Sequence, residues 1–258
     1  MGSLDTAHVL ITGGGSGLGA AMARALAASG AAVSLAGRRR DALATIAASL
    51  PRAAICPADI TREDDCARMV AEARSAFGPI DIVIANAGAA ASAPFAKTTR
   101  AQWQAAIDVN LTGTFLTVHA ALPDLLRPVE AHGAPRRIVL VASTAGLKGY
   151  AYVAPYVAAK HGVVGLARAL AAEYARTPLT ANAVCPGYVD TPLLDQTIAT
   201  IVAKTGRGAD EARAALVQSN PQGRLVTPEE VAATVAWLCS AAAASITGQA
   251  IAVAGGEL

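Results

Sequence analysis

Short, uninterrupted apolar runs alternate with helical segments along almost the whole chain, and this alternation limits the fold more than any other feature. Runs of four to seven apolar residues without polar alternation are typical of strands that are buried on both faces. Because helical segments separate them, such strands are expected to pair in parallel under helices on both sides. The runs are HVLIT (8–12), AAVSLAG (31–37), AAICPAD (53–59), DIVIANAG (81–88), RIVLVAS (137–143), LTANAVCPG (179–187) and QAIAVAGG (249–256). The sequence therefore predicts an α/β fold with a seven-stranded parallel sheet.

The segments between these runs carry helical patterns. They are 17–29, 39–49, 61–77, 100–126 (with a break near Asn110), 153–174 and 226–240. The last begins with Thr227 as N-cap, Pro228 at the first position and Glu230 three residues past the cap. No domain boundary is visible, so residues 1–258 are expected to form one domain. The long segment at about 188–225 follows the sixth run, at the sheet edge where α/β folds bind ligands, and it is the candidate substrate loop.

Composition argues against several classes of protein. The chain has 258 residues, is 53% hydrophobic and has a formal net charge of +2. This charge is too small to indicate nucleic-acid binding, and no run reaches the roughly 18 apolar residues of a membrane span. The four cysteines stand far apart, so neither a disulfide framework nor a metal site is expected. The segment before the first strand lacks the features of a signal peptide, which predicts a cytoplasmic protein.

A glycine-rich stretch, ITGGGSGLG (11–19), lies between the first strand and the first helix. Gly13, Gly17 and Gly19 would let the backbone turn tightly and approach a pyrophosphate at the N-terminus of the helix. A flexible turn is the alternative, but the strand–turn–helix context favours nucleotide binding. Since no Gly-Lys-Ser/Thr follows, a dinucleotide is preferred over ATP.

The end of the second predicted strand bears on the choice of dinucleotide. Folds that prefer NAD usually place an acidic residue there, to bind the ribose 2′-hydroxyl. Here Gly37 is followed by Arg38, Arg39 and Arg40. These cations oppose the dipole of the next helix, and the 2′-phosphate of NADP would relieve that conflict. We therefore expect NADP rather than NAD, the alternative being a solvated arginine cluster partly neutralised by Asp41.

The stretch YVAAK (156–160) places Tyr156 one helical turn before Lys160. A free phenol titrates near ~10, which is too high for a good acid or base at neutral pH. An ammonium at roughly 4 Å, with an effective dielectric of ~20, favours the phenolate by about 4 kcal/mol, or about three pKa units before desolvation. Ser143, at the end of the fifth predicted strand, would hold a substrate oxygen for Tyr156. Such a pair also arises by chance on helix surfaces, so the argument rests on its combination with Ser143 and the glycine loop.

In this combination the chain resembles the short-chain dehydrogenases/reductases of about 250 residues, nearest to 3-oxoacyl reductases and 3-hydroxyacyl dehydrogenases. The resemblance runs from about residue 7 to the C-terminus. The matching motifs are TGGGSGLG (12–19), Asp59, NAG (86–88), Asn110 in VNLTG, Ser143, YVAAK (156–160) and PGYVDT (186–191). The resemblance implies a single-domain, Rossmann-like, doubly wound sheet with helices on both faces, and no metal.

The resemblance also implies roles for particular residues. Tyr156 would be the catalytic acid/base, Lys160 would lower its pKa and bind the nicotinamide ribose, Ser143 would orient the carbonyl, and Asn110 would hold a water that links Lys160 to solvent. The implied cofactor-binding residues are Gly13, Ser16, Gly17, Leu18, Gly19, Arg38, Arg39, Asp59, Ile60, Asn86, Ala87, Gly88, Tyr156, Lys160, Pro186, Gly187, Val189 and Thr191. Asp59 would contact adenine, and Asn86 would steady the sheet.

The reaction implied is hydride transfer between a nicotinamide and a carbonyl or secondary alcohol of a small-molecule substrate. A 3-oxoacyl or 3-hydroxyacyl compound is favoured, and a cyclic alcohol, steroid or sugar stays open. Lys148 is expected to be a solvated loop lysine, with binding of an anionic substrate group as the alternative. A non-catalytic dinucleotide sensor is the alternative of another class. The helices at 102–126 and 153–174 are apolar over much of their circumference, so something must bury them. In proteins that this chain resembles, these two helices pair across subunits, and the resemblance therefore implies a homotetramer, with a dimer as the alternative.

Overall fold

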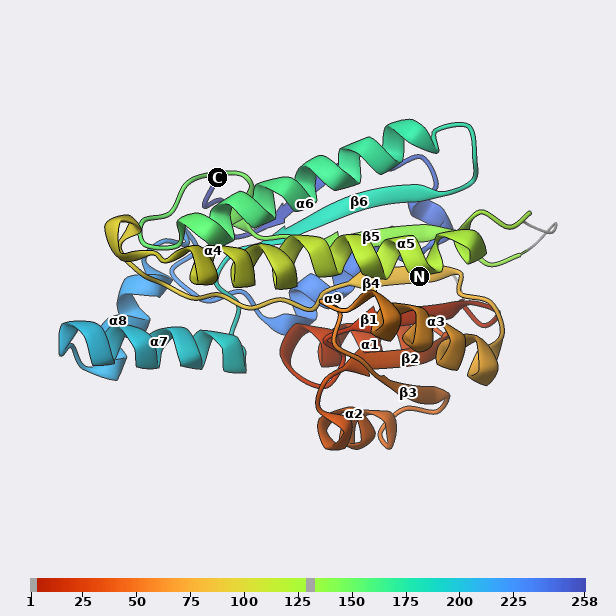
Figure 1. Cartoon of the computed structure of the whole chain (residues 1–258), viewed down its shortest axis with the longest axis horizontal. Coiled ribbons are helices and arrows are strands. Elements are labelled where there is room, and N and C mark those ends of the chain that lie inside the picture. Colours follow the sequence, from red (N-terminus) through yellow and green to blue (C-terminus); the bar gives the residue numbers. More distant parts are fainter. Residues whose placement is uncertain (1–3, 129–132) are drawn as a thin grey trace.

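In the computed structural model, which describes residues 4–128 and 133–258, the strands form one seven-stranded parallel sheet (Figure 1). Its order is β3-β2-β1-β4-β5-β6-β7. The strands are β1 (His8–Thr12), β2 (Ala32–Gly37), β3 (Ala53–Pro57), β4 (Ile82–Ala85), β5 (Arg137–Val141), β6 (Thr180–Pro186) and β7 (Ala250–Val253). All neighbouring pairs are parallel, with registers such as Val9 opposite Val33 and Leu140 opposite Ala183. The predicted parallel sheet is confirmed.

Helices cover both faces of this sheet. They are α1 (Gly17–Ala28), α2 (Arg40–Ala47), α3 (Glu63–Phe77), α4 (Arg100–Ile107), α5 (Gly113–Leu125), α6 (Ala154–Glu173), α7 (Pro192–Thr205), α8 (Ala209–Val217) and α9 (Pro228–Cys239). The buried residues of α1 and α9 belong to one core cluster, and those of α3, α5 and α6 belong to another. In Figure 1, α7 and α8 lie at one end of the sheet and take no part in either layer.

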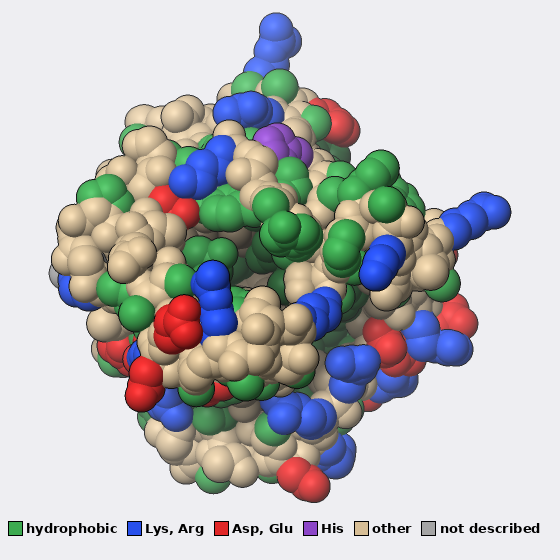
Figure 2. Space-filling model, turned by 90° about the vertical axis from the view of Figure 1, so that its left-hand side faces the viewer, with side chains coloured by type: hydrophobic (Ala, Val, Ile, Leu, Met, Phe, Trp, Pro, Cys, Tyr) green, Lys and Arg blue, Asp and Glu red, His purple; other side chains and the backbone are tan. Residues whose placement is uncertain are grey.

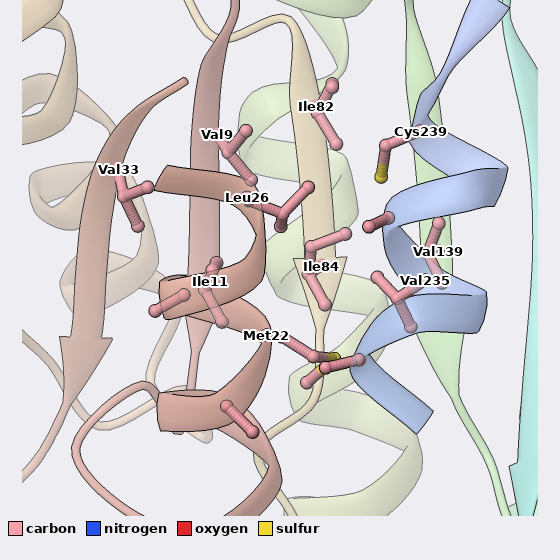
Figure 3. Packing of buried hydrophobic residues seen from close by; sticks show 14 of the residues in the cluster. Val9, Ile11, Met22, Leu26, Val33, Ile82, Ile84, Val139, Val235 and Cys239 are labelled. Atoms are coloured by element: carbon pink, nitrogen blue, oxygen red, sulfur yellow. The ribbon is translucent and has the colours of Figure 1, made fainter. Parts of the chain in front are cut away.

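Successive residues of each strand point into the two different cores. Val9 and Ile11 of β1 pack with Leu26 of α1 and Val235 of α9, as Figure 3 shows. Leu10, between them, belongs to the opposite core. Both faces of the strand are therefore apolar, because each is covered by helices. This is why the strands read as uninterrupted apolar runs.

Several local predictions are confirmed and two are refined. Thr227 and Glu230 form the predicted capping box at the start of α9. The predicted break near Asn110 is a π-helical turn over Asp108–Thr112, between α4 and α5. Ser143 does not end β5, which stops at Val141; it is the N-cap of a 3₁₀ turn over Thr144–Gly146. The unassigned segment at 188–225 contains α7 and α8.

The chain reverses its direction of winding between β1 and β4, which are neighbours in the sheet. From β1 the chain proceeds outward through β2 and β3, and from β4 it proceeds the other way. The loops that leave the carboxyl ends of β1 and β4 therefore diverge and leave a crevice. The candidate site lies at this edge.

Candidate active site

A cavity of about 200 Å³ opens at the carboxyl edge of the sheet. Figure 2 looks onto this side of the molecule and shows a central hollow in which hydrophobic side chains gather. Many of the predicted site residues line the cavity: Leu18, Asn86, Gly88, Asn110, Ser143, Tyr156, Lys160, Pro186, Gly187, Val189 and Thr191. Residues that are far apart in the sequence thus meet around one space, as the motifs predicted.

The glycine loop has the geometry that its sequence indicates. Gly13 has φ +68°, and a Cβ there would lie 2.7 Å from the Asn86 side-chain nitrogen. A Cβ on Gly19 would lie only 2.1 Å from the Gly13 carbonyl oxygen, so the turn requires glycine. Ser16 is the N-cap residue of α1 and has extended backbone. Its hydroxyl accepts no hydrogen bond from the first N–H groups of the helix. Unclaimed N–H groups at a helix N-terminus are suited to a pyrophosphate.

Asn86 joins this loop to the sheet. Its Nδ2 donates to the Thr12 carbonyl at 2.9 Å, and its backbone N–H donates to the Thr12 hydroxyl at 3.0 Å. The N–H of Ala87 donates to the same hydroxyl at 3.1 Å. The ends of β1 and β4 are therefore bound together beside the cavity.

One of the arginines after β2 reaches the glycine loop. Arg39 is exposed, and its guanidinium donates to the Ser16 hydroxyl at 3.2 Å. Asp59 accepts hydrogen bonds from the N–H and the hydroxyl of Thr61, which lower the pKa of its carboxyl. The nearby charge of Arg38 acts in the same direction. The Ile60 side chain is buried at Gly113 of α5, so it does not face the glycine loop.

Tyr156 and Lys160 project from the first turns of α6 into the cavity. The Lys160 ammonium donates to the Val141 carbonyl at 2.7 Å and lies 5.6 Å from the centre of the Tyr156 ring. Ser143, two residues beyond β5, accepts from the Ala145 N–H at 3.1 Å. The predicted grouping of these three side chains is therefore present.

The expected lowering of the Tyr156 pKa is wrong. Burial raises the pKa of Tyr156, and a hydrogen bond with Ser143 opposes this rise only in part. Burial also lowers the pKa of Lys160 to about 8. The attraction expected from the sequence was given before desolvation. In the structure Lys160 is buried and Tyr156 is half-buried, and desolvation outweighs the attraction.

Asn110 is fully buried in the π-helical turn. Its Nδ2 donates to the carbonyls of Ala89 and Ala106 at 2.8 and 2.9 Å, and its Oδ1 accepts from the Ala89 N–H at 3.2 Å. The side chain thus binds the loop after β4 to the helix. A Cβ on Gly88 would lie 2.7 Å from Asn110 Oδ1 and 3.6 Å from Lys160 Nζ, so this glycine leaves both side chains room.

The turn after β6 closes the opposite wall of the cavity. Val189 is buried and bridges to Val226, and the N–H of Asp190 donates to the Val226 carbonyl at 3.0 Å. Thr191 caps α7 and lies against Gly17 of the glycine loop. The predicted turn from Pro186 to Thr191 therefore faces the cofactor loop across the crevice.

Sequence reasoning missed a polar network beside this turn. The Glu257 side chain is 2% exposed and meets the Lys148 ammonium at 3.2 Å and the Tyr150 hydroxyl at 2.5 Å. The hydroxyls of Tyr150 and Thr144 are 2.7 Å apart. Lys148, which was expected to be a solvated loop lysine, is 37% exposed in its side chain but is also paired with this carboxylate. The sequence signal that could have indicated this network is AGGEL (254–258), in which one acidic residue, Glu257, follows two glycines after an apolar strand.

Comparisons with known proteins agree with this arrangement. A family model described as enoyl-(acyl carrier protein) reductase matches residues 13–257. A protein of Streptomyces virginiae, whose name describes a ketoacyl reductase of the monensin polyketide synthase, is 40% identical over 252 residues, covering 96% of this chain and 95% of its own. The D-β-hydroxybutyrate dehydrogenase of Cupriavidus necator is 38% identical over 250 residues, covering 95% of both chains.

A solved structure extends the likeness to three dimensions. A variant of actinorhodin polyketide ketoreductase with NADPH superimposes with a TM-score of 0.92 and 35% identity. The match covers 100% of this chain and 99% of the ketoreductase. The likeness therefore includes the edge of the sheet at which the cavity opens.

Proposed function

The chain belongs to the short-chain dehydrogenase/reductase family, and from this premise we propose that it interconverts 3-oxoacyl and 3-hydroxyacyl compounds. It is an NAD(P)-dependent oxidoreductase that acts on carbonyl and secondary alcohol groups. The substrate proposal is supported by the names of the two relatives, which are a ketoacyl reductase and a hydroxybutyrate dehydrogenase. A compact cyclic ketone is the second candidate, because the cavity is small and bordered by Tyr188, Leu193 and Val153.

The observation that carries the proposal is the meeting of Tyr156, Lys160 and Ser143 in one cavity beside the glycine loop. In the reducing direction, Tyr156 gives its proton to the carbonyl oxygen, and Ser143 holds that oxygen by a hydrogen bond. A bound nicotinamide supplies the hydride for the carbonyl carbon. Desolvation raises the pKa of the Tyr156 phenol and keeps it protonated, as a proton donor must be. The ammonium of Lys160, 5.6 Å from the centre of the Tyr156 ring, then stabilises the phenolate that is left until a proton returns to it.

The proposed cofactor site runs from the glycine loop to the end of β2. The N-terminal N–H groups of α1 would bind the pyrophosphate, and Asp59 would lie near the adenine. Arg39 reaches Ser16 in that loop, and together with Arg38 it would meet the 2′-phosphate of NADP. We therefore propose NADP rather than NAD. Asn110 would support Lys160 indirectly, because it holds the loop at Gly88 and Ala89 beside the lysine.

We also propose a cytoplasmic homotetramer, with a dimer as the alternative. The segment Arg100–Leu125 is long and apolar enough to cross a membrane by length and composition. Of its most apolar 18 residues, 33% are buried within the described chain, so most of this apolar stretch is exposed. A single such helix is weak evidence for a span, because helices of soluble proteins pass the same test. Trp103 and Phe115 on this segment are 39% and 46% exposed, which suits a contact with a second copy.

Substitution of Tyr156 by Phe tests the chemistry. NADPH oxidation is followed with ethyl acetoacetate and cyclohexanone as substrates. Loss of the phenolic proton should reduce kcat by at least ~100-fold, while NADPH binding, measured by fluorescence, stays near that of the wild type. Full turnover by Tyr156→Phe with intact cofactor binding would exclude this mechanism.

A second substitution tests the choice of cofactor. Arg39→Ser should lower the ratio of kcat/KM with NADPH to that with NADH by roughly tenfold, since one charge-assisted phosphate contact is worth about 1.5–3 kcal/mol at most. Arg40→Ser is the matched control, because Arg40 is the first residue of α2 and has no bond to the glycine loop among the described contacts. Equal effects of the two variants would contradict the assignment.

A further inference from the structure

Glu257 is a buried carboxylate directly behind the wall of the cavity. The side chains that pair with it come from more than a hundred residues earlier in the chain, in the loop after β5. A Cβ on Gly187, which lines the cavity, would lie 2.9 Å from Glu257 Oε2. Gly255 and Gly256, with φ of +61° and +89°, form the turn that brings this carboxylate back to the site. The last turn of the chain is therefore built into the cavity wall.

Glu257 binds Lys148, which lies in the loop after β5. Lys148 Nζ donates to the Glu257 carbonyl at 2.9 Å and pairs with its carboxylate at 3.2 Å. The same carboxylate accepts from Tyr150, whose ring lies 5.2 Å from Lys148 Nζ and lines the cavity. One positive and one negative charge thus cancel at this corner, and Lys148 is not free to bind an anion.

Three other cations near this edge each have a partner of their own. Lys160 is the charged side chain among the described residues that line the cavity, and it is bonded to Val141 at the floor beside Tyr156. Lys204 on α7 donates to the backbone and hydroxyl of Ser92. Arg213 on α8 pairs with Asp190 at 2.8 Å. A substrate carboxylate beside Gly187 and Tyr150 would lose its hydration, and the lysine next to these residues, Lys148, is already held by Glu257. Burial of an anion without a partner is unfavourable.

We propose that the group beside the reacting carbonyl of the substrate is uncharged, and that Glu257 enforces this by holding Lys148. This inference rests on the proposed function and specifies it: the enzyme takes esters, thioesters, amides or ring ketones, and it discriminates against free 3-oxocarboxylates. Glu257 is in this sense a specificity-determining residue that acts through Lys148 and Tyr150.

The first test compares matched substrates that differ in one charge. NADPH oxidation is measured with acetoacetate and ethyl acetoacetate, and with 4-oxocyclohexanecarboxylate and its methyl ester. The neutral member of each pair should have a kcat/KM at least ~10-fold higher. Equal or higher kcat/KM for the anions would overturn the inference and leave the proposed function intact. Failure to reduce any of the four ketones, with NADPH bound, would instead contradict the proposed function.

The second test removes the charge that pairs with Lys148. Glu257→Gln keeps an amide oxygen as acceptor for Tyr150 but removes the charge that holds Lys148. The ratio of kcat/KM for ethyl acetoacetate to that for acetoacetate should fall by roughly tenfold in Glu257→Gln. The double variant Glu257→Gln/Lys148→Met should restore the wild-type ratio. An unchanged preference in Glu257→Gln, with NADPH affinity retained, would refute the role of Glu257.

Comparison of Glu257→Gln/Lys148→Met with the wild type tests Lys148 without leaving a buried carboxylate unpaired. Because the lysine is already occupied in the wild type, the double variant should keep the ratio of kcat/KM for ester and acid within about twofold of the wild-type ratio. A selective loss of activity with acetoacetate in the double variant would show that Lys148 serves as an anion site in the wild type, contrary to the proposal.

Discussion

Replacing Lys160 by Met should stabilise the folded chain at neutral pH while removing its activity. The Lys160 side chain is almost fully buried, and the residue is 3% exposed. Among residues 4–128 and 133–258, its ammonium has one hydrogen bond, to the Val141 carbonyl, and no carboxylate partner. Met fills a similar volume without a charge, so the substitution isolates the free energy of burying the ammonium.

The magnitude follows from the pKa of this group. Burial lowers the pKa of Lys160 from 10.5 to about 8. At about 1.4 kcal/mol per pKa unit, the charged lysine destabilises the fold by about 3 kcal/mol below pH 8. Loss of the hydrogen bond to Val141 returns about 1 kcal/mol. The free energy of unfolding of Lys160→Met should therefore exceed that of the wild type by about 2 kcal/mol at pH 7.

The destabilisation by the charged Lys160 should depend on pH. The folded protein releases the Lys160 proton as pH rises through about 8, and the unfolded chain releases it only near 10.5. The destabilisation is thus fully present below pH 8 and fades above it, so less than half should remain at pH ~9.5. The advantage of Lys160→Met should shrink accordingly.

Urea unfolding followed by circular dichroism at pH 7 and pH ~9.5 measures both effects. The control is Lys97→Met, on the exposed 3₁₀ turn after β4, which should leave the difference from wild type independent of pH. If Lys160→Met unfolds at lower urea than the wild type at pH 7, or if its advantage does not decrease with pH, the reasoning from burial is refuted.

Three further outcomes are expected. Thr227→Ala removes the acceptor of the Glu230 N–H bond, 3.2 Å long, and should reduce the free energy of unfolding by about 1 kcal/mol in urea; no change would mean that the cap is dispensable. Leu26→Ala, at the contact of α1 with α9, should reduce it by about 2–5 kcal/mol, and a loss below about 1 kcal/mol would contradict the packing of that core. Gly19→Ala would place a Cβ 2.1 Å from the Gly13 carbonyl, so NADPH binding measured by fluorescence should weaken by at least ~10-fold, and unchanged affinity would exclude this loop as the cofactor site.

Local patterns accounted for the elements with good accuracy. The apolar runs lie within a few residues of the observed strands, and the capping box at Thr227 and the break at Asn110 were both legible, because caps and helix breaks depend on neighbours within about four residues. Boundaries were less exact: the run that ends at Ser143 continues apolar beyond the point where β5 stops pairing. The α7 and α8 helices were missed because the segment at 188–225 mixes helical stretches with Gly and Pro.

The amino-acid sequence by itself determined the parallel sheet, the position of the glycine loop and the turn that separates Tyr156 from Lys160, because each follows from residue spacing over a short stretch. Only the tertiary structure determined how deeply Tyr156 and Lys160 are buried, and hence that their pKa values move against the simple pair attraction. It also brought Glu257 to Lys148 across 109 positions of the chain. Desolvation and contacts of this kind depend on how distant segments pack together, which no local pattern records.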